Sequence, residues 1–301
     1  MTMTIAFIGL GNMGGGMAAN QAKAGRRVKA FDLSEAAVAR AVQAGCVAAG
    51  SVVEAVKDAD VVITMLPAGP HVLKVYTEQI IGAAPSSALL LDCSTIDVDT
   101  ARKVAGLAKE AGYAFADAPV SGGTMAADAG TLAFMVGCDE GDFSRIEPAL
   151  EPMSRATFRA GDHGAGQAAK ICNNMILGIT MLGTCEAIGL AEKLGLDPVR
   201  MFDIVSKSSG QSWSTTTYYP CPGPVPTAPS NRNYDGGFAT AMMLKDLKLA
   251  QDAAAKAGAS TPLGAQTEAL FQMFDRLGYG GRDFSAILQL LRGKLDELPK
   301  G

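Results

Sequence analysis

The chain has 301 residues, a length typical of about two domains and sufficient to bury a core without disulfide bonds. Hydrophobic residues make up 48% of it and charged residues 19%, which is a globular rather than a disordered composition. Acidic residues outnumber basic ones by 30 to 26 and no basic block occurs, so nucleic acid is not expected as a partner. The six cysteines show no CxxC spacing and only two histidines occur. We therefore expect reduced, mostly buried thiols in a reducing compartment and no bound metal.

The start of the chain lacks the pattern of an export signal, because the first apolar run begins at Ile5 without a basic segment or a cleavage site. The longest apolar stretch, 175–191, is interrupted by Glu186 and by several glycines. It also falls short of the ~18 residues expected of a membrane span. We expect a cytoplasmic protein without membrane contact, in which this stretch forms a buried helix.

Up to about residue 162, short β-rich runs alternate with alanine-rich helical patterns. Strands are expected at 4–9, 27–33, 59–66 and 88–95, and helices at 12–24, from about Ser34, after Pro70 and from near Asp97. Continuously apolar strands separated by helices are typical of a parallel sheet covered on both faces. Three later strands, at 114–120, 131–137 and 156–161, have shorter connections, so the sheet should end in mixed strands. The pattern predicts an α/β fold, with a Rossmann-type doubly wound sheet over residues 1–162.

After Asp162 the β pattern ceases, which predicts an all-helical C-terminal domain over residues 163–301. An apolar pattern over 164–194 corresponds to a helix of ~45 Å, too long and too apolar to be covered by one small domain. We expect this helix to be buried between domains or between subunits. Further helices are expected at 198–207, 239–257, 263–277 and 284–291. The segment 218–234 contains five prolines and should form an ordered loop.

The beginning of the chain carries the pattern GxGxxG in Gly9, Leu10, Gly11, Asn12, Met13 and Gly14. It follows a predicted strand and opens a predicted helix, which is the context that binds a dinucleotide. The first glycine permits the turn, the second lets the backbone approach a pyrophosphate, and the third lets the helix pack on the strand. Free N–H groups at the helix start attract the anion. A tight turn without a ligand is the alternative.

Asp32 ends the second predicted strand, close to the ~20-residue separation expected for the acid that binds the adenosine ribose. Its carboxylate would accept hydrogen bonds from both ribose hydroxyls and repel a 2′-phosphate, which favours NAD over NADP. Alternatively, Asp32 only begins the turn that follows. Leu66-Pro67 and Ser94-Thr95 lie at the carboxyl ends of two further strands, where such sheets contact ligands. They could equally be strand ends or helix caps.

Two polar constellations point to chemistry. The loop Ser121-Gly122-Gly123 follows a strand and offers a hydroxyl with unobstructed N–H groups, which suits a carboxylate unless it is an ordinary glycine-rich turn. Lys170 and Asn174 are four residues apart and share one helix face in an otherwise apolar segment. Removal from water lowers the pKa of a lysine, so such a group can exchange a proton with an alcohol near neutral pH. A surface lysine beside a capping asparagine is the alternative.

A second lysine, Lys245, precedes Asp246 in another mostly apolar helix, and adjacent residues do not share a helix face. We therefore expect these two side chains to meet different partners.

Four segments, at 9–20, 117–137, 161–174 and 243–250, together resemble the β-hydroxyacid dehydrogenase family, in the family's order and over nearly the whole chain. The segment 208–238 is similar to the proline-rich excursion of the 3-hydroxyisobutyrate dehydrogenase subgroup, which the shorter glyoxylate and succinic semialdehyde reductases lack. Three positions depart from the pattern: Gly16 replaces a common proline, Gln21 a leucine and Arg26 a histidine. Gly15 and Gly16 should each loosen the first helix by ~1 kcal/mol relative to alanine.

The resemblance implies roles at the matching positions. Lys170 would be the catalytic acid/base. Substrate contacts would fall on Ser121, Gly122, Gly123, Asn174, Trp213 and Asp246, although burial alone would also explain Trp213. Besides the glycine motif and Asp32, cofactor contacts would fall on Leu66, Pro67, Thr95 and Lys245, the last closing over the cofactor from the helical domain.

The activity that the resemblance implies is NAD-dependent oxidation of a small 3-hydroxy acid. The first candidate is (S)-3-hydroxyisobutyrate, oxidised to methylmalonate semialdehyde in valine catabolism. L-Serine, or D-glycerate with tartronate semialdehyde, are alternatives, whereas 6-phosphogluconate would need a cationic pocket that the C-terminal half does not indicate. A non-catalytic dinucleotide-binding scaffold is the alternative from another class, and the presence of Lys170 and Asn174 argues against it. The long apolar helix predicts a homodimer or homotetramer.

Overall fold

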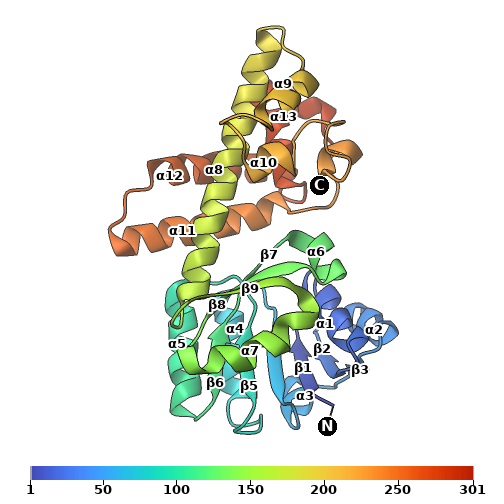
Figure 1. The fold of residues 1–301 in the computed structure, drawn as a ribbon, viewed down its shortest axis with the longest axis vertical. Helices are drawn as coiled ribbons and strands as arrows, with labels where there is room; N and C mark the ends of the chain where they lie inside the picture. The colour runs from blue at the N-terminus through green and yellow to red at the C-terminus, as the bar shows by residue number, and fades with distance from the viewer. Residues whose placement is uncertain (1, 301) are drawn as a thin grey trace. The chain divides into compact units, whose positions relative to one another are not determined.

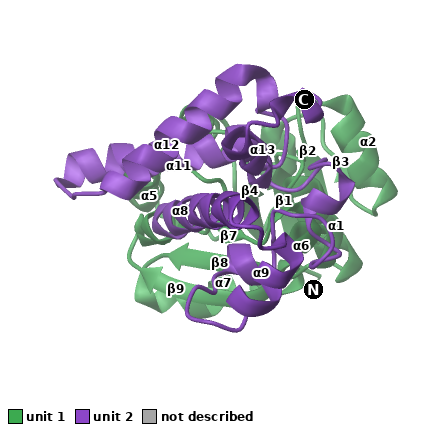
Figure 2. Cartoon of the chain, turned by 90° about the horizontal axis from the view of Figure 1, so that it is seen from above, with its two compact units in different colours: residues 1–170 green, residues 171–301 purple. Residues whose placement is uncertain are grey.

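The computed structural model describes residues 2–300 and contains two compact units, residues 1–170 and residues 171–301 (Figures 1 and 2). The division between the units falls inside helix α8 (Ala165–Lys193). The change from β to helical pattern in the sequence comes earlier, at about residue 162. Packing therefore assigns the first turns of this helix to the N-terminal unit, and Lys170 is the last residue of that unit.

The first unit is built from short strands and helices in alternation. Its strands are β1 (Thr4–Ile8), β2 (Arg27–Phe31), β3 (Val47–Ala48), β4 (Val61–Thr64), β5 (Leu89–Asp92), β6 (Ala114–Asp117), β7 (Val120–Ser121), β8 (Leu132–Gly137) and β9 (Ser154–Gly161). Its helices are α1 (Gly14–Lys23), α2 (Glu35–Gln43), α3 (Val52–Val56), α4 (Gly69–Val75) with a π-helical turn at Tyr76–Ile80, α5 (Val98–Glu110), α6 (Gly123–Ala129) and α7 (Phe143–Leu150).

The strands form one sheet in the order β3-β2-β1-β4-β5-β6-β8-β7, with β9 paired to β8. Neighbours from β3 to β6 are parallel, β8 is antiparallel to β6 and β7, and β9 is parallel to β8. This confirms the predicted doubly wound sheet with mixed strands at one end. In such a sheet the order reverses between β1 and β4, and ligands bind outside the carboxyl ends of the strands there.

The carboxyl ends of the parallel strands are aligned across the sheet. Ile8 pairs with both Phe31 and Thr64, Thr64 pairs with Asp92, and Asp92 pairs with Asp117. The residues that directly follow these five strand ends therefore lie along the same edge of the sheet.

Helices cover both faces of the sheet (Figure 1). The buried side chains of α1, α2, α6 and α7 belong to one apolar cluster with one face of the strands. Those of α3, α4 and α5 belong to a second cluster with the opposite face. Polar caps determine where several helices begin, because the side chains of Ser34, Ser51 and Asp97 accept hydrogen bonds from the first turns of α2, α3 and α5.

The second unit is helical. Its helices are the remainder of α8, α9 (Pro198–Val205), α10 (Trp213–Thr216), α11 (Thr240–Ala257), α12 (Pro262–Phe274) with a π-helical turn at Asp275–Tyr279, and α13 (Ile287–Arg292). Its core combines one face of α8 with apolar side chains of α11, α12 and α13. By length and composition, α8 could cross a membrane, with a mean hydropathy of 1.4 and 44% of its most apolar window buried. The core helix of a soluble domain has the same properties, and Met181, Cys185 and Ile188 of α8 are fully buried in this unit.

The proline-rich segment 218–234 is an ordered loop, as predicted, and its tyrosines anchor it. The Tyr219 hydroxyl donates to the Pro198 carbonyl at 2.9 Å, and the Tyr234 hydroxyl donates to the Pro220 carbonyl at 2.8 Å. Both rings are buried. The six cysteines are free, and only Cys172 is exposed.

Candidate active site

The glycine motif forms the turn from β1 into α1. Gly9 has φ +95°, and a Cβ there would overlap the Met65 carbonyl oxygen at the end of β4. A Cβ on Gly14 would overlap the Gly9 carbonyl oxygen. Gly11 differs, because nothing lies within 4 Å of the position its Cβ would take. Protein packing thus explains the first and third glycines, whereas the open space at Gly11 suits the approach of a ligand.

The helix begins two residues later than predicted, at Gly14, which leaves Leu10, Asn12 and Met13 in the turn. Within residues 2–300, the N–H groups of Asn12 and Met13 donate no hydrogen bond to another group. Free N–H groups at a helix N-terminus attract phosphate. Together with the open space at Gly11, this arrangement fits the pyrophosphate of a dinucleotide.

Asp32 lies directly after β2 at the same edge. Its Oδ2 accepts a hydrogen bond from the Leu10 N–H at 2.6 Å, and its Oδ1 accepts one from the Ser34 N–H at 2.7 Å. These contacts fix the carboxylate beside the glycine turn. Because a carboxylate has about four lone-pair sites, it can still accept the hydroxyls of a ribose.

The carboxyl ends of β4 and β5 are joined through Ser94. Its hydroxyl donates to Asp92 Oδ1 at 2.6 Å and accepts from the Leu66 N–H at 2.8 Å. Thr64 also donates to Asp92 Oδ1, at 2.7 Å, while within residues 2–300 Asp92 Oδ2 has no hydrogen-bond partner. Burial raises the pKa of Asp92 to about 6. Of the predicted cofactor residues around this buried network, Leu66 and Thr95 are half-buried and Pro67 is exposed.

The predicted carboxylate loop begins at the end of β7. Gly122 and Gly123 have φ of +134° and +71°, conformations that other residues rarely adopt, and they lead into α6. The neighbouring helix α1 approaches α6 closely, since a Cβ on Gly16 would overlap Asp128. Asn20 of α1 donates to the Ala127 carbonyl at 2.7 Å. Glycine at position 16 therefore allows α6, the helix that follows the loop, to pack closely against α1. This packing role was not expected from the sequence, which indicated only a looser helix.

The start of α8 rests on the end of β6. Asp117 Oδ1 accepts from the Gly164 N–H at 2.7 Å, and Asp117 Oδ2 accepts from the Gln167 N–H at 2.9 Å. A Cβ on Gly166 would overlap the Met135 carbonyl oxygen, so this first turn needs glycine to seat on the sheet. Burial raises the pKa of Asp117, and the two backbone hydrogen bonds oppose that rise. Lys170 follows one turn later, with 7% of its surface exposed.

In the second unit, the structure connects three of the predicted residues. Asn174 Nδ2 donates to Asp246 Oδ2 at 2.5 Å, and both residues are buried. Lys245 Nζ lies 3.6 Å from Asp246 Oδ1. The expectation that Lys245 and Asp246 meet different partners is therefore wrong as stated. The lysine side chain is long enough to reach the neighbouring carboxylate although the Cα–Cβ bonds of the two residues diverge.

Trp213 opens α10 and is 46% exposed, so burial does not explain it. Its ring stacks on Tyr218 with centroids 4.6 Å apart, and Tyr218 stacks in turn on Phe284. The Tyr218 hydroxyl donates to the buried carboxylate of Asp283 at 2.6 Å. The Trp213 side chain is thus accessible on one face, and its other face packs on Tyr218, whose position is fixed by Phe284 and Asp283.

The first unit thus brings the glycine motif, Asp32, Leu66, Pro67 and Thr95 to one sheet edge and seats the helix of Lys170 on the same row of strand ends. Sequence reasoning missed the buried polar residues behind them: Asp92, Asp117 and Gln167. A charged residue inside an apolar strand was the available signal for Asp92 and Asp117, and nothing local distinguished Gln167.

Two family models match the chain. One, described as the NAD binding domain of 6-phosphogluconate dehydrogenase, matches residues 4–161. The other, described as NAD-binding of NADP-dependent 3-hydroxyisobutyrate dehydrogenase, matches residues 164–291.

Similar proteins carry related names. A 3-hydroxyisobutyrate dehydrogenase of Pseudomonas aeruginosa is 50% identical, over 96% of this chain and 99% of its own length. An NAD-dependent L-serine dehydrogenase of the same species is 46% identical, over 95% of this chain and 97% of its own. A solved structure, Mycobacterium tuberculosis 3-hydroxyisobutyrate dehydrogenase with L-serine, has a TM-score of 0.92 and 47% identity, covering 97% of this chain and 100% of that one.

Proposed function

The chain belongs to the β-hydroxyacid dehydrogenase family and is a hydroxy-acid oxidoreductase that uses NAD or NADP. Within this family, we propose that it oxidises (S)-3-hydroxyisobutyrate to methylmalonate semialdehyde with NAD. The observation that carries the proposal is the placement of Lys170. It is a buried lysine on a helix whose first turn is fixed by Asp117 at the edge that carries the glycine motif. The names of several relatives support the substrate.

In the proposed reaction, neutral Lys170 Nζ takes the proton of the substrate hydroxyl as the carbon–oxygen double bond forms. When bound, NAD accepts the hydride that leaves the same carbon. In the reverse direction, protonated Lys170 returns the proton to the carbonyl oxygen. The N–H groups and hydroxyl of the Ser121-Gly122-Gly123 loop would hold the substrate carboxylate. The roles assigned to Asn174, Trp213, Lys245 and Asp246 stay predictions.

The choice of NAD over NADP rests on Asp32. Its carboxylate is fixed at the end of β2 by the N–H groups of Leu10 and Ser34, and a 2′-phosphate there would meet a negative charge. Arg26 does not compensate for that charge, because its guanidinium binds Gln21 and the carbonyl oxygens of Pro148 and Ala149.

L-Serine is the second candidate substrate. A relative named as an NAD-dependent L-serine dehydrogenase is nearly as similar as those named for 3-hydroxyisobutyrate, and the similar solved structure contains L-serine. Both substrates have a carboxylate and a primary hydroxyl on the third carbon, so the same groups would act on either. With (S)-3-hydroxyisobutyrate as the substrate, we also propose that the enzyme acts in valine catabolism in the cytoplasm.

The test is the initial rate of reduction of NAD, with NADP in parallel, over a panel of hydroxy acids. The panel contains (S)- and (R)-3-hydroxyisobutyrate, L-serine, D-glycerate and 6-phosphogluconate. The highest kcat/KM with (S)-3-hydroxyisobutyrate and NAD is expected. A higher value with L-serine would replace the substrate and keep the mechanism, and no turnover on any hydroxy acid would overturn the proposal.

A further inference from the structure

Gln167 makes two side-chain hydrogen bonds that bracket Thr95. Its Nε2 donates to the Ser94 carbonyl at 2.7 Å, and its Oε1 accepts from the Ile96 N–H at 3.1 Å. The residue is fully buried, and its own N–H donates to Asp117 Oδ2. One side chain therefore holds the backbone on both sides of a predicted cofactor residue.

The same residue lies one helical turn before Lys170 on α8. A primary amide supplies both a donor and an acceptor, which the Ser94 carbonyl and the Ile96 N–H require. Ser94 extends the connection, because its hydroxyl accepts from the Leu66 N–H and donates to Asp92. Through Gln167, the helix that carries the lysine is thus tied to the ends of both β5 and β4.

We propose that Gln167 is a positioning residue that sets the spacing between Lys170 and the cofactor-binding strand ends through its two hydrogen bonds around Thr95. The inference rests on the proposed function, since it concerns the transfer of a proton and a hydride from one substrate carbon. Reacting groups must be aligned closely, and a misplacement of about 1 Å can cost about 100-fold in rate. In this role Gln167 contacts neither of the reacting groups and acts only through the backbone of Ser94 and Ile96, to which it is hydrogen-bonded.

Gln21 is a matched control within the same unit. It is also a fully buried glutamine, its Nε2 donates to the Ala149 carbonyl at 2.8 Å, and its Oε1 accepts from Arg26 at 2.7 Å. These partners connect α1 to the end of α7 and include no predicted site residue. Gln167→Leu leaves the Ser94 carbonyl and the Ile96 N–H without this partner. Gln21→Leu removes one donor to the Ala149 carbonyl, which keeps Arg26, and removes one acceptor of the Arg26 guanidinium. Both variants should therefore lose stability.

The experiment compares Gln167→Leu with Gln21→Leu in the full-length protein. We expect kcat to fall about 100-fold in Gln167→Leu and to stay within about twofold in Gln21→Leu, at similar losses of Tm. The Kd for NADH, measured by fluorescence, should change less than about threefold in both. Hydrogen exchange should accelerate at the Ile96 amide only in Gln167→Leu.

A conservative variant gives a further readout. In Gln167→Glu, a neutral carboxylic acid offers one donor and one acceptor, whereas the ionised form has no donor for the Ser94 carbonyl. The ratio of its kcat to that of the wild type should therefore rise as the pH is lowered, and that of Gln167→Leu should not.

Two results would overturn the inference while the wild type remains active. One is a kcat for Gln167→Leu within about threefold of the wild type despite a lowered Tm. The other is a fall in kcat matched by an equal loss of NADH affinity, which would make Gln167 part of cofactor binding alone. An inactive wild type, by contrast, would overturn the proposed function itself and this role with it.

Discussion

Asn174 of α8 donates a hydrogen bond to Asp246 of α11 at 2.5 Å, so two residues 72 apart in sequence are paired inside the helical unit. Asp246 is 3% exposed and Asn174 is 2% exposed. A buried carboxylate that loses a partner retains its desolvation cost, whereas loss of both members of the pair removes the problem. The pair should therefore be coupled energetically.

We predict that Asn174→Ala and Asp246→Ala each lower the free energy of unfolding by about 2 kcal/mol, and that the double variant loses clearly less than their sum. Urea denaturation of the four proteins measures the coupling. Asn173→Ala serves as the neighbouring control, because Asn173 is only partly buried and donates to Asn174 rather than to Asp246. Additive losses would show that the hydrogen bond contributes little.

The parallel sheet and the long helix were predictable because local patterns specify them. Apolar runs marked β1, β2, β4 and β5, and the apolar pattern over 164–194 located α8 within one residue at each end. Elements without such a pattern were not predicted. Strand β3 has two exposed residues, and α6 consists mostly of small residues with one buried alanine.

The candidate site was predictable only where residue type and spacing carry the chemistry, as in the glycine motif, Asp32 and Lys170. The supporting contacts join residues far apart in the chain: Gln167 reaches a carbonyl 73 residues away, and Asp117 an amide 47 away. A local pattern contains no information on such pairs. Similarly, the proximity of Asp128 that requires glycine at position 16 arises from the packing of α6 on α1.

Lys170 is the residue on which the proposed mechanism depends. We predict that Lys170→Ala lowers kcat by about 10²–10⁴-fold, the range of general acid–base catalysis, while NADH still binds. Stopped-flow rates and NADH fluorescence titration measure the two properties. Lys103→Ala, at an exposed position of α5, is the control and should keep the wild-type rate. A near-normal rate for Lys170→Ala would remove this lysine from the mechanism.

Asp32 should determine the cofactor preference. Asp32→Asn loses the charge that we assign to the ribose hydroxyls, and hydrogen bonds to a charged group contribute ~1.5–3 kcal/mol. We predict that kcat/KM with NAD falls about 10- to 100-fold and that the ratio of NADP to NAD turnover rises. Ser34→Ala removes the cap of α2 in the same turn without changing a charge, so it should lower stability and leave that ratio unchanged. An unchanged ratio in Asp32→Asn would contradict the ribose assignment.

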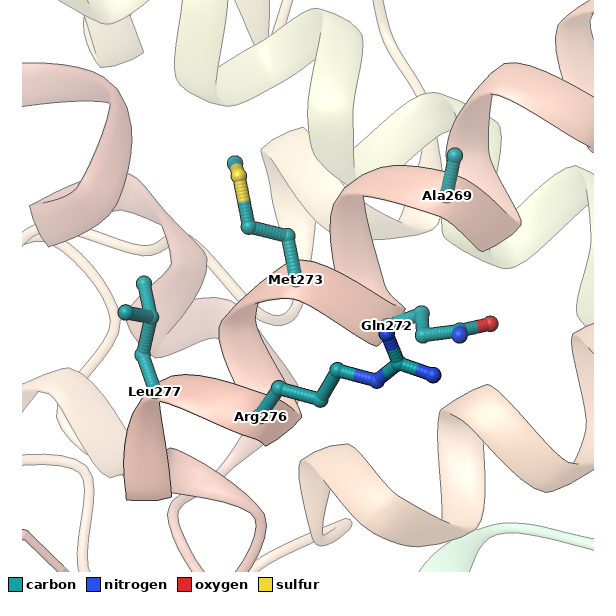
Figure 3. Close-up of a pocket in the computed structure, with 5 residues that line it drawn as sticks. All are labelled: Ala269, Gln272, Met273, Arg276 and Leu277. Carbon is teal, nitrogen blue, oxygen red and sulfur yellow. The ribbon is translucent and has the colours of Figure 1, made fainter.

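Self-association is predicted from exposed apolar side chains of the helical unit. On α8, Ile176 and Leu190 are 59% and 61% exposed, and Leu194, directly after the helix, is 75% exposed. Along α12 and its π-helical turn, Met273 and Leu277 point the same way beside a hollow of about 390 Å³ (Figure 3). Apolar groups that gather on a monomer surface mark contact sites.

We therefore expect a dimer or tetramer by light scattering at micromolar concentration, and a shift toward monomer in the double variant Met273→Glu/Leu277→Glu. Val42→Glu is the matched control, since Val42 on α2 has the same exposed fraction, 45%, as Met273. A monomeric wild type would contradict the prediction. An unchanged oligomer in the double variant would instead exclude the α12 face as the contact.

The buried carboxyl of Asp92 predicts how stability depends on pH. Burial raises its pKa to about 6 from 3.8, so between these values the folded state binds a proton that the unfolded state has lost. The contribution of this group to stability therefore falls as the pH rises from about 4 to about 6, by up to ~3 kcal/mol at 1.36 kcal/mol per unit. Asp92→Asn stays neutral, and its fixed structural cost does not vary with pH.

The Tm of Asp92→Asn minus that of the wild type should therefore increase between pH 4 and pH 7. Asp58→Asn is a control that should change little over this range, because a hydrogen bond from Lys29 lowers the pKa of Asp58 below 3.8 and its carboxyl is then largely ionised in both states above pH 4. Calorimetric scans of the three proteins at matched ionic strength measure both differences. A Tm difference for Asp92→Asn that stays flat across this range would show that Asp92 is ionised in the fold at pH 4. In that case the donors Ser94 and Thr64 would outweigh the effect of burial on its carboxylate.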